Sequence, residues 1–268
     1  MWDEELEASS RRRFAWLAGA VAAGAVFLAG WYWFSHRSAP VAEPVTARAP
    51  PPAAEPEPSI SHPIPSEATD ASALPGLNDS DQLAHDSLAG VIGRDPVDQF
   101  IIPQNIIRHV VVTVDNLPRR KVAVDLRPVK PTPGATVVAT QGEITTLSAE
   151  NYERYAPLMR VVAAADPKAL AVVYERLYPL FQQSYEDLGY PGKYFNDRLV
   201  EVIDNLLQTP EVTTPLALVQ PKVFYEFADQ DLEARPAGQK LLLRMGPANA
   251  RILKAKLREF RAEIVKKK

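Results

Sequence analysis

The sequence predicts a mainly α-helical domain that follows a single transmembrane helix and a proline-rich linker. Residues 14–34 form an uncharged apolar run, ten prolines fall between residues 38 and 75, and hydrophobic residues recur at helical spacing from residue 76 onward. The predicted organisation is a cytoplasmic tail at 1–13, a transmembrane helix at 14–34, a disordered linker at 35–76 and an α-helical extracytoplasmic domain with a small β-hairpin at 77–268.

The apolar run reads FAWLAGAVAAGAVFLAGWYWF and holds 21 residues. At 1.5 Å per residue it forms a helix of about 31 Å, the thickness of the hydrocarbon core of a bilayer. Arg11, Arg12 and Arg13 precede it, which places the N-terminus in the cytoplasm. A cleaved signal peptide is the alternative, but its apolar region would be shorter and would end at small residues rather than at WYWF. The pattern therefore favours an uncleaved anchor.

The segment behind the anchor has the composition of a spacer. It lacks aromatic residues between positions 38 and 75 and is rich in Pro, Ala and Glu. Such a chain cannot bury enough apolar surface to offset the entropy of ordering, so we expect disorder with polyproline II character. A proline-motif ligand is the alternative interpretation.

The first half of the domain is predicted to contain helices and one hairpin. We expect a helix at 78–93, capped by Asn78, Asp79 or Ser80, and a second helix at 104–116, although its β-branched residues would also suit a strand. Residues 136–147, with Gln141 and Gly142 at the middle, predict a short hairpin. Ser148 begins a helix that runs to about residue 165.

The second half is predicted to be helical with one extended piece. Asp166 and Pro167 are an N-cap and a first-turn proline for a helix to about residue 188, with Gly189 just beyond its end. Hydrophobic spacing then predicts a helix from about 195 to 206, and Val223, Tyr225 and Phe227 alternate as in a short strand. Two helices, at about 237–245 and 247–265, end the chain.

Four stretches resemble a bacterial family known only as a domain of unknown function, the DUF3014 type. They are RLYPLFQQSYEDLGYPGKYFNDRLVEVIDNLL at 176–207, VTVDNLPR at 112–119, ALVQPKVFYEFAD at 217–229 and QKLLLRMGPANA at 239–250. The resemblance spans residues 77–262 and implies a membrane-anchored envelope protein with one folded domain. Together with the anchor, it implies an inner-membrane location with a periplasmic domain. It supplies no activity, cofactor or catalytic residue.

Composition and motifs argue against several function classes. The 30 basic and 33 acidic residues nearly balance, unlike those of a nucleic-acid binder. The chain has no Cys, and its four His are not spaced as metal ligands. It lacks the glycine-rich nucleotide motifs and the Gly-x-Ser-x-Gly elbow. We therefore assign no catalytic residue, no metal and no cofactor. The oligomeric state is left open.

Two glutamates are candidates for the catalytic carboxyl group of an enzyme that hydrolyses cell-wall glycan. Glycoside cleavage needs a carboxyl group in an apolar setting, and Glu175 and Glu186 lie among aromatic residues. However, the neighbouring aromatics at 174, 178, 181 and 185 recur at helical spacing, which is typical of a buried helix stripe. A hydrolase that uses Glu175 or Glu186 is therefore the alternative, and a non-enzymatic binding or scaffolding module is the leading interpretation.

Two groups of residues are candidates for binding a partner. Tyr is favoured at interfaces, so Tyr178, Gln182, Tyr190 and Tyr194 could line a groove, although core packing also explains them. In the last helix, a second group forms a basic strip beside a hydrophobic one and would suit an anionic lipid or wall polymer. A solvated helix face is the alternative for this strip, which consists of Arg251, Lys254, Arg258 and Arg261.

Overall fold

A computed structural model describes residues 60–64, 74–121, 123–213 and 215–265. The anchor predicted at 14–34 and most of the linker predicted at 35–76 lie outside the described residues. Among the helices of the described part, none is both long enough and apolar enough to cross a membrane.

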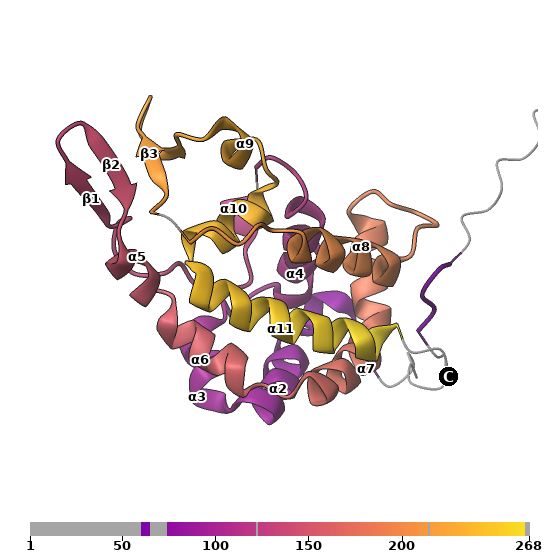
Figure 1. Cartoon of the computed structure of the whole chain (residues 1–268). Coiled ribbons are helices and arrows are strands. Elements are labelled where there is room, and N and C mark those ends of the chain that lie inside the picture. The colour runs from indigo at the N-terminus through magenta and orange to yellow at the C-terminus, as the bar shows by residue number, and fades with distance from the viewer. Residues whose placement is uncertain (1–59, 65–73, 122, 214, 266–268) are drawn as a thin grey trace, which may run out of the picture. The chain divides into compact units, whose positions relative to one another are not determined.

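The described chain is mainly helical, as the sequence predicts (Figure 1). Short 3₁₀ turns, η3 (Leu77–Asp79) and η4 (Val124–Leu126), stand beside the longer elements. The α-helices are α2 (Asp81–Ile92), α3 (Arg94–Phe100), α4 (Ile106–Asn116), α5 (Ala149–Glu153), α6 (Ala156–Ala164), α7 (Pro167–Asp187), α8 (Phe195–Leu207), α9 (Gln230–Glu233), α10 (Ala237–Arg244) and α11 (Pro247–Ile264).

The longest helix, α7, begins and ends where its sequence signals predict. The Asp166 carboxylate accepts a hydrogen bond from the backbone N–H of Lys168 at 2.9 Å, and Pro167 occupies the first turn. Gly189, just beyond the helix, has a φ of 107°, which a residue with a side chain rarely adopts. Local chemistry therefore fixes both ends of the helix that carries Tyr174, Tyr178, Phe181 and Tyr185.

The helix predicted from Ser148 to about residue 165 is in fact two helices, α5 and α6. Pro157 stands in the first turn of α6. It has no N–H to donate to the carbonyl of Glu153, so one continuous helix would lose that hydrogen bond. The predicted helices at 78–93, 104–116, 195–206, 237–245 and 247–265 are confirmed, with small shifts of their ends, whereas α3 and α9 were not predicted.

A small antiparallel sheet has the strand order β1-β2-β3-β4. Its strands are β1 (Val138–Gln141), β2 (Ile144–Leu147), β3 (Ala217–Val219) and β4 (Glu226–Phe227). The predicted hairpin is confirmed as β1 and β2, with Gln141 opposite Ile144 at the turn. The short extended piece predicted near Phe227 is β4, but β3 was not predicted. In β3, Leu218 pairs with Thr145 on one side and with Phe227 on the other.

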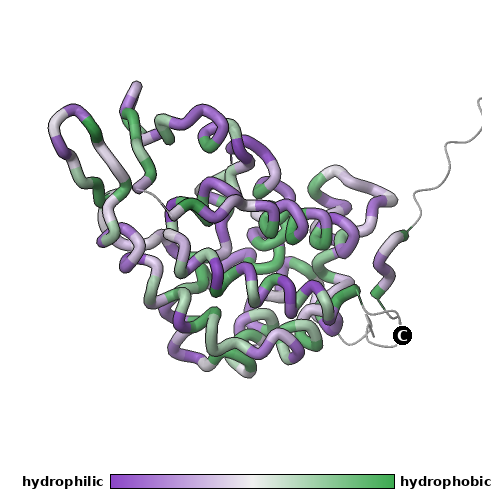
Figure 2. Tube along the Cα trace, in the orientation of Figure 1, coloured by the Kyte–Doolittle hydropathy of each residue, from purple (hydrophilic) through white to green (hydrophobic). Residues whose placement is uncertain are grey.

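The described residues form a large helical core and a small one under the sheet. Helix α11 packs on α6, α7 and α8, and runs along the helical body in Figure 1. Along these helices hydrophobic positions alternate with hydrophilic ones, as Figure 2 shows. The small core consists of Leu147, Leu216, Leu218, Phe227 and Leu243. The sheet therefore packs on its own small core, apart from the large helical core.

Candidate functional site

Helices α2, α3, α4, α6, α7, α8 and α11 surround a cavity of about 430 Å³. Its wall consists almost entirely of aliphatic and aromatic side chains, for example Leu88, Val162, Leu170, Val173 and Leu257. The volume lies in the range of about 300–1,000 Å³ that is usual for small-molecule sites. The cavity thus has the size of a small-molecule site.

The residues of α7 and α6 explain why space remains there. Leu170, Val173 and Leu177 lie at spacings of three and four residues, so one stripe of α7 faces the cavity. Across it, α6 contributes Leu158, Val161 and Val162. Aromatic residues also border the cavity, among them Tyr174 and Phe181 farther along α7. The cavity therefore lies between helices whose facing aliphatic and aromatic side chains leave space between them.

Lys256 is the one charged residue among the described residues that line the cavity. Its side chain is 27% exposed, and its Nζ donates a hydrogen bond to the carbonyl of Ala165 at 2.9 Å. Glu259 lies 3.8 Å from the same Nζ. A lysine can lay its methylene groups along an apolar wall while its ammonium reaches water. Lys256 therefore places a positive charge on a wall that is otherwise apolar.

The structure brings the four predicted groove residues together at the C-terminal half of α7. Tyr178 is buried and donates to Oε1 of Gln182 at 2.9 Å. The same oxygen accepts from the backbone N–H of Phe195, and the amide nitrogen of Gln182 donates to the carbonyl of Lys193. Gln182 thus holds α7 to the start of α8, and Tyr178 belongs to the core rather than to an open groove.

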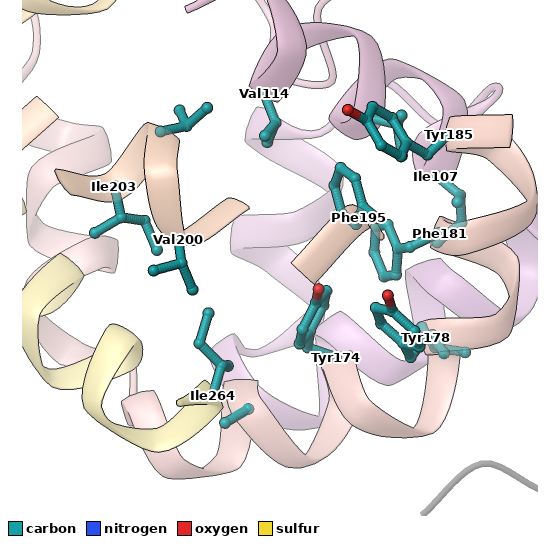
Figure 3. Packing of buried hydrophobic residues seen from close by; sticks show 14 of the residues in the cluster. Ile107, Val114, Tyr174, Tyr178, Phe181, Tyr185, Phe195, Val200, Ile203 and Ile264 are labelled. Carbon is teal, nitrogen blue, oxygen red and sulfur yellow. The ribbon is translucent and has the colours of Figure 1, made fainter. Parts of the chain in front are cut away.

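Tyr190 and Tyr194 are half-buried at the edge of the same cluster. The ring of Tyr190 stacks on Tyr185, with centroids 4.6 Å apart, and the ring of Tyr194 lies 5.3 Å from that of Tyr178. Figure 3 shows the neighbouring rings gathered in one region of the core: those of Tyr174, Tyr178, Phe181, Tyr185 and Phe195. The rings thus pack on one another at this end of α7, and Tyr185, Tyr190 and Tyr194 also line a hollow of about 390 Å³ beside them.

A buried carboxylate completes this end of the molecule. Asp115 is 3% exposed and accepts a hydrogen bond from the hydroxyl of Tyr190 at 3.2 Å. Its carboxylate also pairs with Arg119 and with Arg198, the latter at 3.2 Å. Burial alone would lower the pKa of Arg198, but hydrogen bonding to Glu201 and the charges of Glu201 and Asp115 raise it. The pairs keep the buried charge of Asp115 compensated.

The predicted basic strip of α11 is divided by the fold. Lys254 is 5% exposed, its Nζ donates to the carbonyl of Thr209, and burial lowers its pKa. Arg261 holds Asp204 through two hydrogen bonds of 2.6 and 2.8 Å. Arg258 is exposed, and Arg251 is exposed with Glu211 at 3.9 Å. Lys254 and Arg261 are therefore hydrogen-bonded within the domain, Arg251 has an exposed ion pair, and the four side chains do not form one free basic face.

The two glutamates considered for catalysis do not line the cavity. Glu175 is half-buried, and Glu186 is exposed and accepts a hydrogen bond from Gln182 at 2.7 Å. Among the residues that the structure describes, no group of three His, Asp or Glu side chains is placed to hold a metal ion. The chemistry of the cavity wall is thus that of apolar contact, with one ammonium group.

Sequence reasoning did not find the cavity or the Asp115 cluster. Helical spacing predicts which residues face inward, but it cannot tell whether they meet across a gap. The available signal was the run of short side chains at and just after the end of α6, where Val161, Val162 and Ala165 line the cavity. For Asp115 the signal was its place in VTVDNLPR, where an acidic residue falls between the inward-facing Val114 and Leu117.

Comparison with known proteins assigns the chain to a family but gives it no activity. No curated protein and no solved structure matches the chain significantly. The model of one protein family, described as "Protein of unknown function (DUF3014)", matches residues 106–261. The match runs from α4 nearly to the end of α11, and so includes most of the helices around the cavity as well as the aromatic cluster. The chain belongs to the DUF3014 family.

Proposed function

We propose that this protein is a membrane-tethered, non-enzymatic binding module whose cavity holds the acyl chain of a lipid or fatty acid. In this proposal, residues 14–34 anchor the chain in the inner membrane with the N-terminus in the cytoplasm, and residues 35–76 tether the domain on the outer side. The observation that carries the proposal is the cavity of about 430 Å³ with its almost wholly apolar wall.

The apolar wall of the cavity argues for an occupant. The cavity opens to solvent, so water contacts this wall when no ligand is bound. An acyl chain would remove the wall from water, and each Å² of apolar surface that is buried contributes about 25 cal/mol.

The chemistry of the wall favours an acyl chain over a polar metabolite. A polar ligand would need several hydrogen-bonding groups, since burying an unpaired polar group costs about 1–3 kcal/mol. Besides Lys256, the lining offers the hydroxyl of Tyr174, which already donates to Asn196 at 3.1 Å. A chain of methylene groups needs no such partners. Its acidic or phosphate head would then lie at the ammonium of Lys256. The proposed anchor would keep the domain beside a store of such lipids.

Photolabelling of the full chain in living bacteria tests this proposal. Cells that express the chain receive a long-chain fatty acid that carries a photoreactive diazirine and an alkyne, and the labelled peptides are mapped by mass spectrometry. We expect label on cavity residues of α6, α7 and α11. Val173→Trp places a large ring in the cavity and should reduce this label several-fold, because Val173 lines the wall.

The neighbouring residue provides a matched control. Val172 is 65% exposed on the same helix and does not line the cavity, so Val172→Trp should leave the label unchanged. Protein levels and protease resistance must match between the two variants. Label confined to residues 14–34, or label on the domain that Val173→Trp leaves intact, would contradict the proposal.

A further inference from the structure

Five residues that precede the domain, Ile60 to Ile64, form the ISHPI segment, which lies against the start of α8 and the end of α11. In Figure 1 it is the short indigo piece beside the C-terminal end of α11. Ile64 is 8% exposed and belongs to the large helical core. The sequence alone places the segment in the disordered linker, so its fixed position is a finding of the structure.

The backbone of the ISHPI segment is held by side chains of the domain. The Asp197 carboxylate accepts from the N–H of Ser61 at 3.0 Å and from the N–H of His62 at 2.7 Å. The hydroxyl of Tyr194 accepts from the N–H of Ile64 at 2.7 Å. Pro63, between His62 and Ile64, has no backbone N–H to donate. Every backbone donor from residue 61 to 64 is therefore paired with a group on or just before α8.

Asn196 completes the contact from the other side. Its amide nitrogen donates to the carbonyl of His62 at 2.9 Å and to the carbonyl of Ile264 at 3.2 Å. Its side-chain oxygen accepts from the hydroxyl of Tyr174, and the residue is fully buried. Asn196 is therefore held in place by the core, and it is aimed at the backbone of the segment. Such a rigid donor is typical of a preorganised binding site.

We infer that Tyr194, Asn196 and Asp197 form a binding site for a short peptide with a Ser-His-Pro-aliphatic pattern, and that the ISHPI segment occupies it as an intramolecular ligand. Recognition combines backbone hydrogen bonds with one side-chain pocket, as in other peptide-binding sites. The site fixes the end of the tether to the domain at Ile64. It also excludes a peptide of the same pattern from a partner while the chain's own segment is bound.

We call the contact of the ISHPI segment with Tyr194, Asn196 and Asp197 the latch, and its expected free energy is small enough for the segment to bind and release reversibly. Ordering a flexible segment costs conformational entropy for each residue, and this cost is of the same size as the gain from a few hydrogen bonds and one buried isoleucine. Beside it, a hollow of about 390 Å³ extends from Ile60 along Tyr190, Lys193 and Glu201. The site therefore has room for a peptide longer than the segment that occupies it.

Binding of a peptide in trans tests the inference. In the full chain, Ile64→Asp places a carboxylate in the core position and should release the latch. A fluorescent peptide of residues 58–66 should then bind this variant roughly tenfold or more tightly than it binds the wild-type chain, where the attached segment competes at high effective concentration. Adding Asp197→Ala to Ile64→Asp should abolish binding. A folded Ile64→Asp chain that does not bind the peptide, or binding that ignores Asp197→Ala, overturns the inference.

Hydrogen exchange keeps the test decisive if Ile64→Asp does not fold. In the wild-type chain, the amides of residues 61, 62 and 64 should be protected, and Asp197→Ala should expose those of Ser61 and His62. Asp204→Ala is the matched control, because Asp204 lies on the same helix but pairs with Arg261. Equal protection in the Asp197→Ala and wild-type chains would show that the segment is not held by this carboxylate.

Disulfide crosslinking tests whether the segment binds its own chain or a second copy. The chain has no Cys, so Ile60→Cys and Lys193→Cys introduce a single pair at two positions that line the same hollow. The inference requires an oxidised product of monomer size, which Asp197→Ala reduces in yield. A disulfide-linked dimer as the main product would contradict binding within one chain.

Discussion

The two halves of α7 carry the same hydrophobic periodicity and pack in opposite ways. In the C-terminal half, Phe181 stacks on Phe195 with ring centroids 5.8 Å apart, and Gln182 closes the gap to α8 with its hydrogen bonds. In the N-terminal half, Leu170 and Val173 face a cavity of about 430 Å³. The C-terminal half is thus joined to α8 by ring contacts and hydrogen bonds, whereas the N-terminal half meets the cavity through aliphatic side chains. Phe181 and Phe195 also border the cavity, so the two kinds of packing adjoin each other.

The difference teaches that hydrophobic periodicity alone does not distinguish a packed core from a cavity wall, since both occur along one stripe of α7. Aromatic residues bury about 150–250 Å² each and can bridge the distance between helices. Val and Leu are shorter, and α6 opposes them with Leu158, Val161 and Val162. In the C-terminal half, Gln182 also forms hydrogen bonds to Phe195 and Lys193, which fix the position of α7 relative to the start of α8. We therefore expect the packed half to provide stability and the open half to provide binding.

The largest expected effect separates Leu180→Ala from Leu170→Ala. Leu180 is 4% exposed in the core and does not line the cavity, so its truncation should lower the free energy of unfolding by about 3 kcal/mol. Leu170 already borders open space, so its truncation should cost about 1 kcal/mol. Urea-dependent pulse proteolysis of the full chain measures both values. Equal losses would show that the two halves do not differ in packing.

A smaller effect concerns the pH dependence of stability. Burial, and then the neighbouring Tyr194, raises the pKa of Tyr178, and burial also raises the pKa of Tyr174. The folded state thus prefers the neutral phenols, and this contribution is complete below the unfolded pKa of about 10 and is lost as the pH rises above it. Stability should fall by up to about 1.4 kcal/mol per pH unit for each of the two tyrosines.

Tyr178→Phe tests this assignment. The variant loses the hydrogen bond to Gln182, so it should be about 1 kcal/mol less stable at neutral pH. Above about pH 10 its stability should fall less steeply than that of the wild-type chain, because one titrating phenol is gone. Unfolding curves in urea between about pH 9 and pH 11.5 give both slopes. Parallel slopes would refute a role for Tyr178 in the alkaline loss of stability.

The packed half was largely predictable from the sequence. The spacing of Tyr174, Tyr178, Phe181 and Tyr185 predicts a buried stripe, and all four are less than 10% exposed. Asp166, Pro167 and Gly189 predict the ends of the helix, because caps act through neighbours in the chain. Strand β3 was not predictable in this way, since three residues carry no clear period and its partners come from β2 and β4.

The open half and the latch could not be predicted, because both depend on contacts that are distant in sequence. The cavity depends on how α6 and α11 approach α7, and no local pattern encodes that distance. In the same way, ISHPI lies among prolines that predict disorder, yet its hydrogen-bond partners are more than 120 residues away. The basic strip shows the reverse error, because a helical wheel cannot reveal that Lys254 bonds Thr209 and that Arg261 pairs with Asp204.

The smallest expected effect concerns the head of the ligand in the open half. If the ammonium of Lys256 contacts an acidic head, a long-chain carboxylate should displace the photoreactive fatty acid from the wild-type chain at a lower concentration than the alcohol of the same length does. A partly exposed ion pair contributes about 0.2–1 kcal/mol, so Lys256→Ala should reduce this preference by at most about fivefold. Arg258→Ala, on the same helix but outside the cavity lining, should not change it. Competition with the photoreactive fatty acid measures the preference. An unchanged preference in Lys256→Ala would place the head away from α11, and the apolar wall alone would then select the ligand.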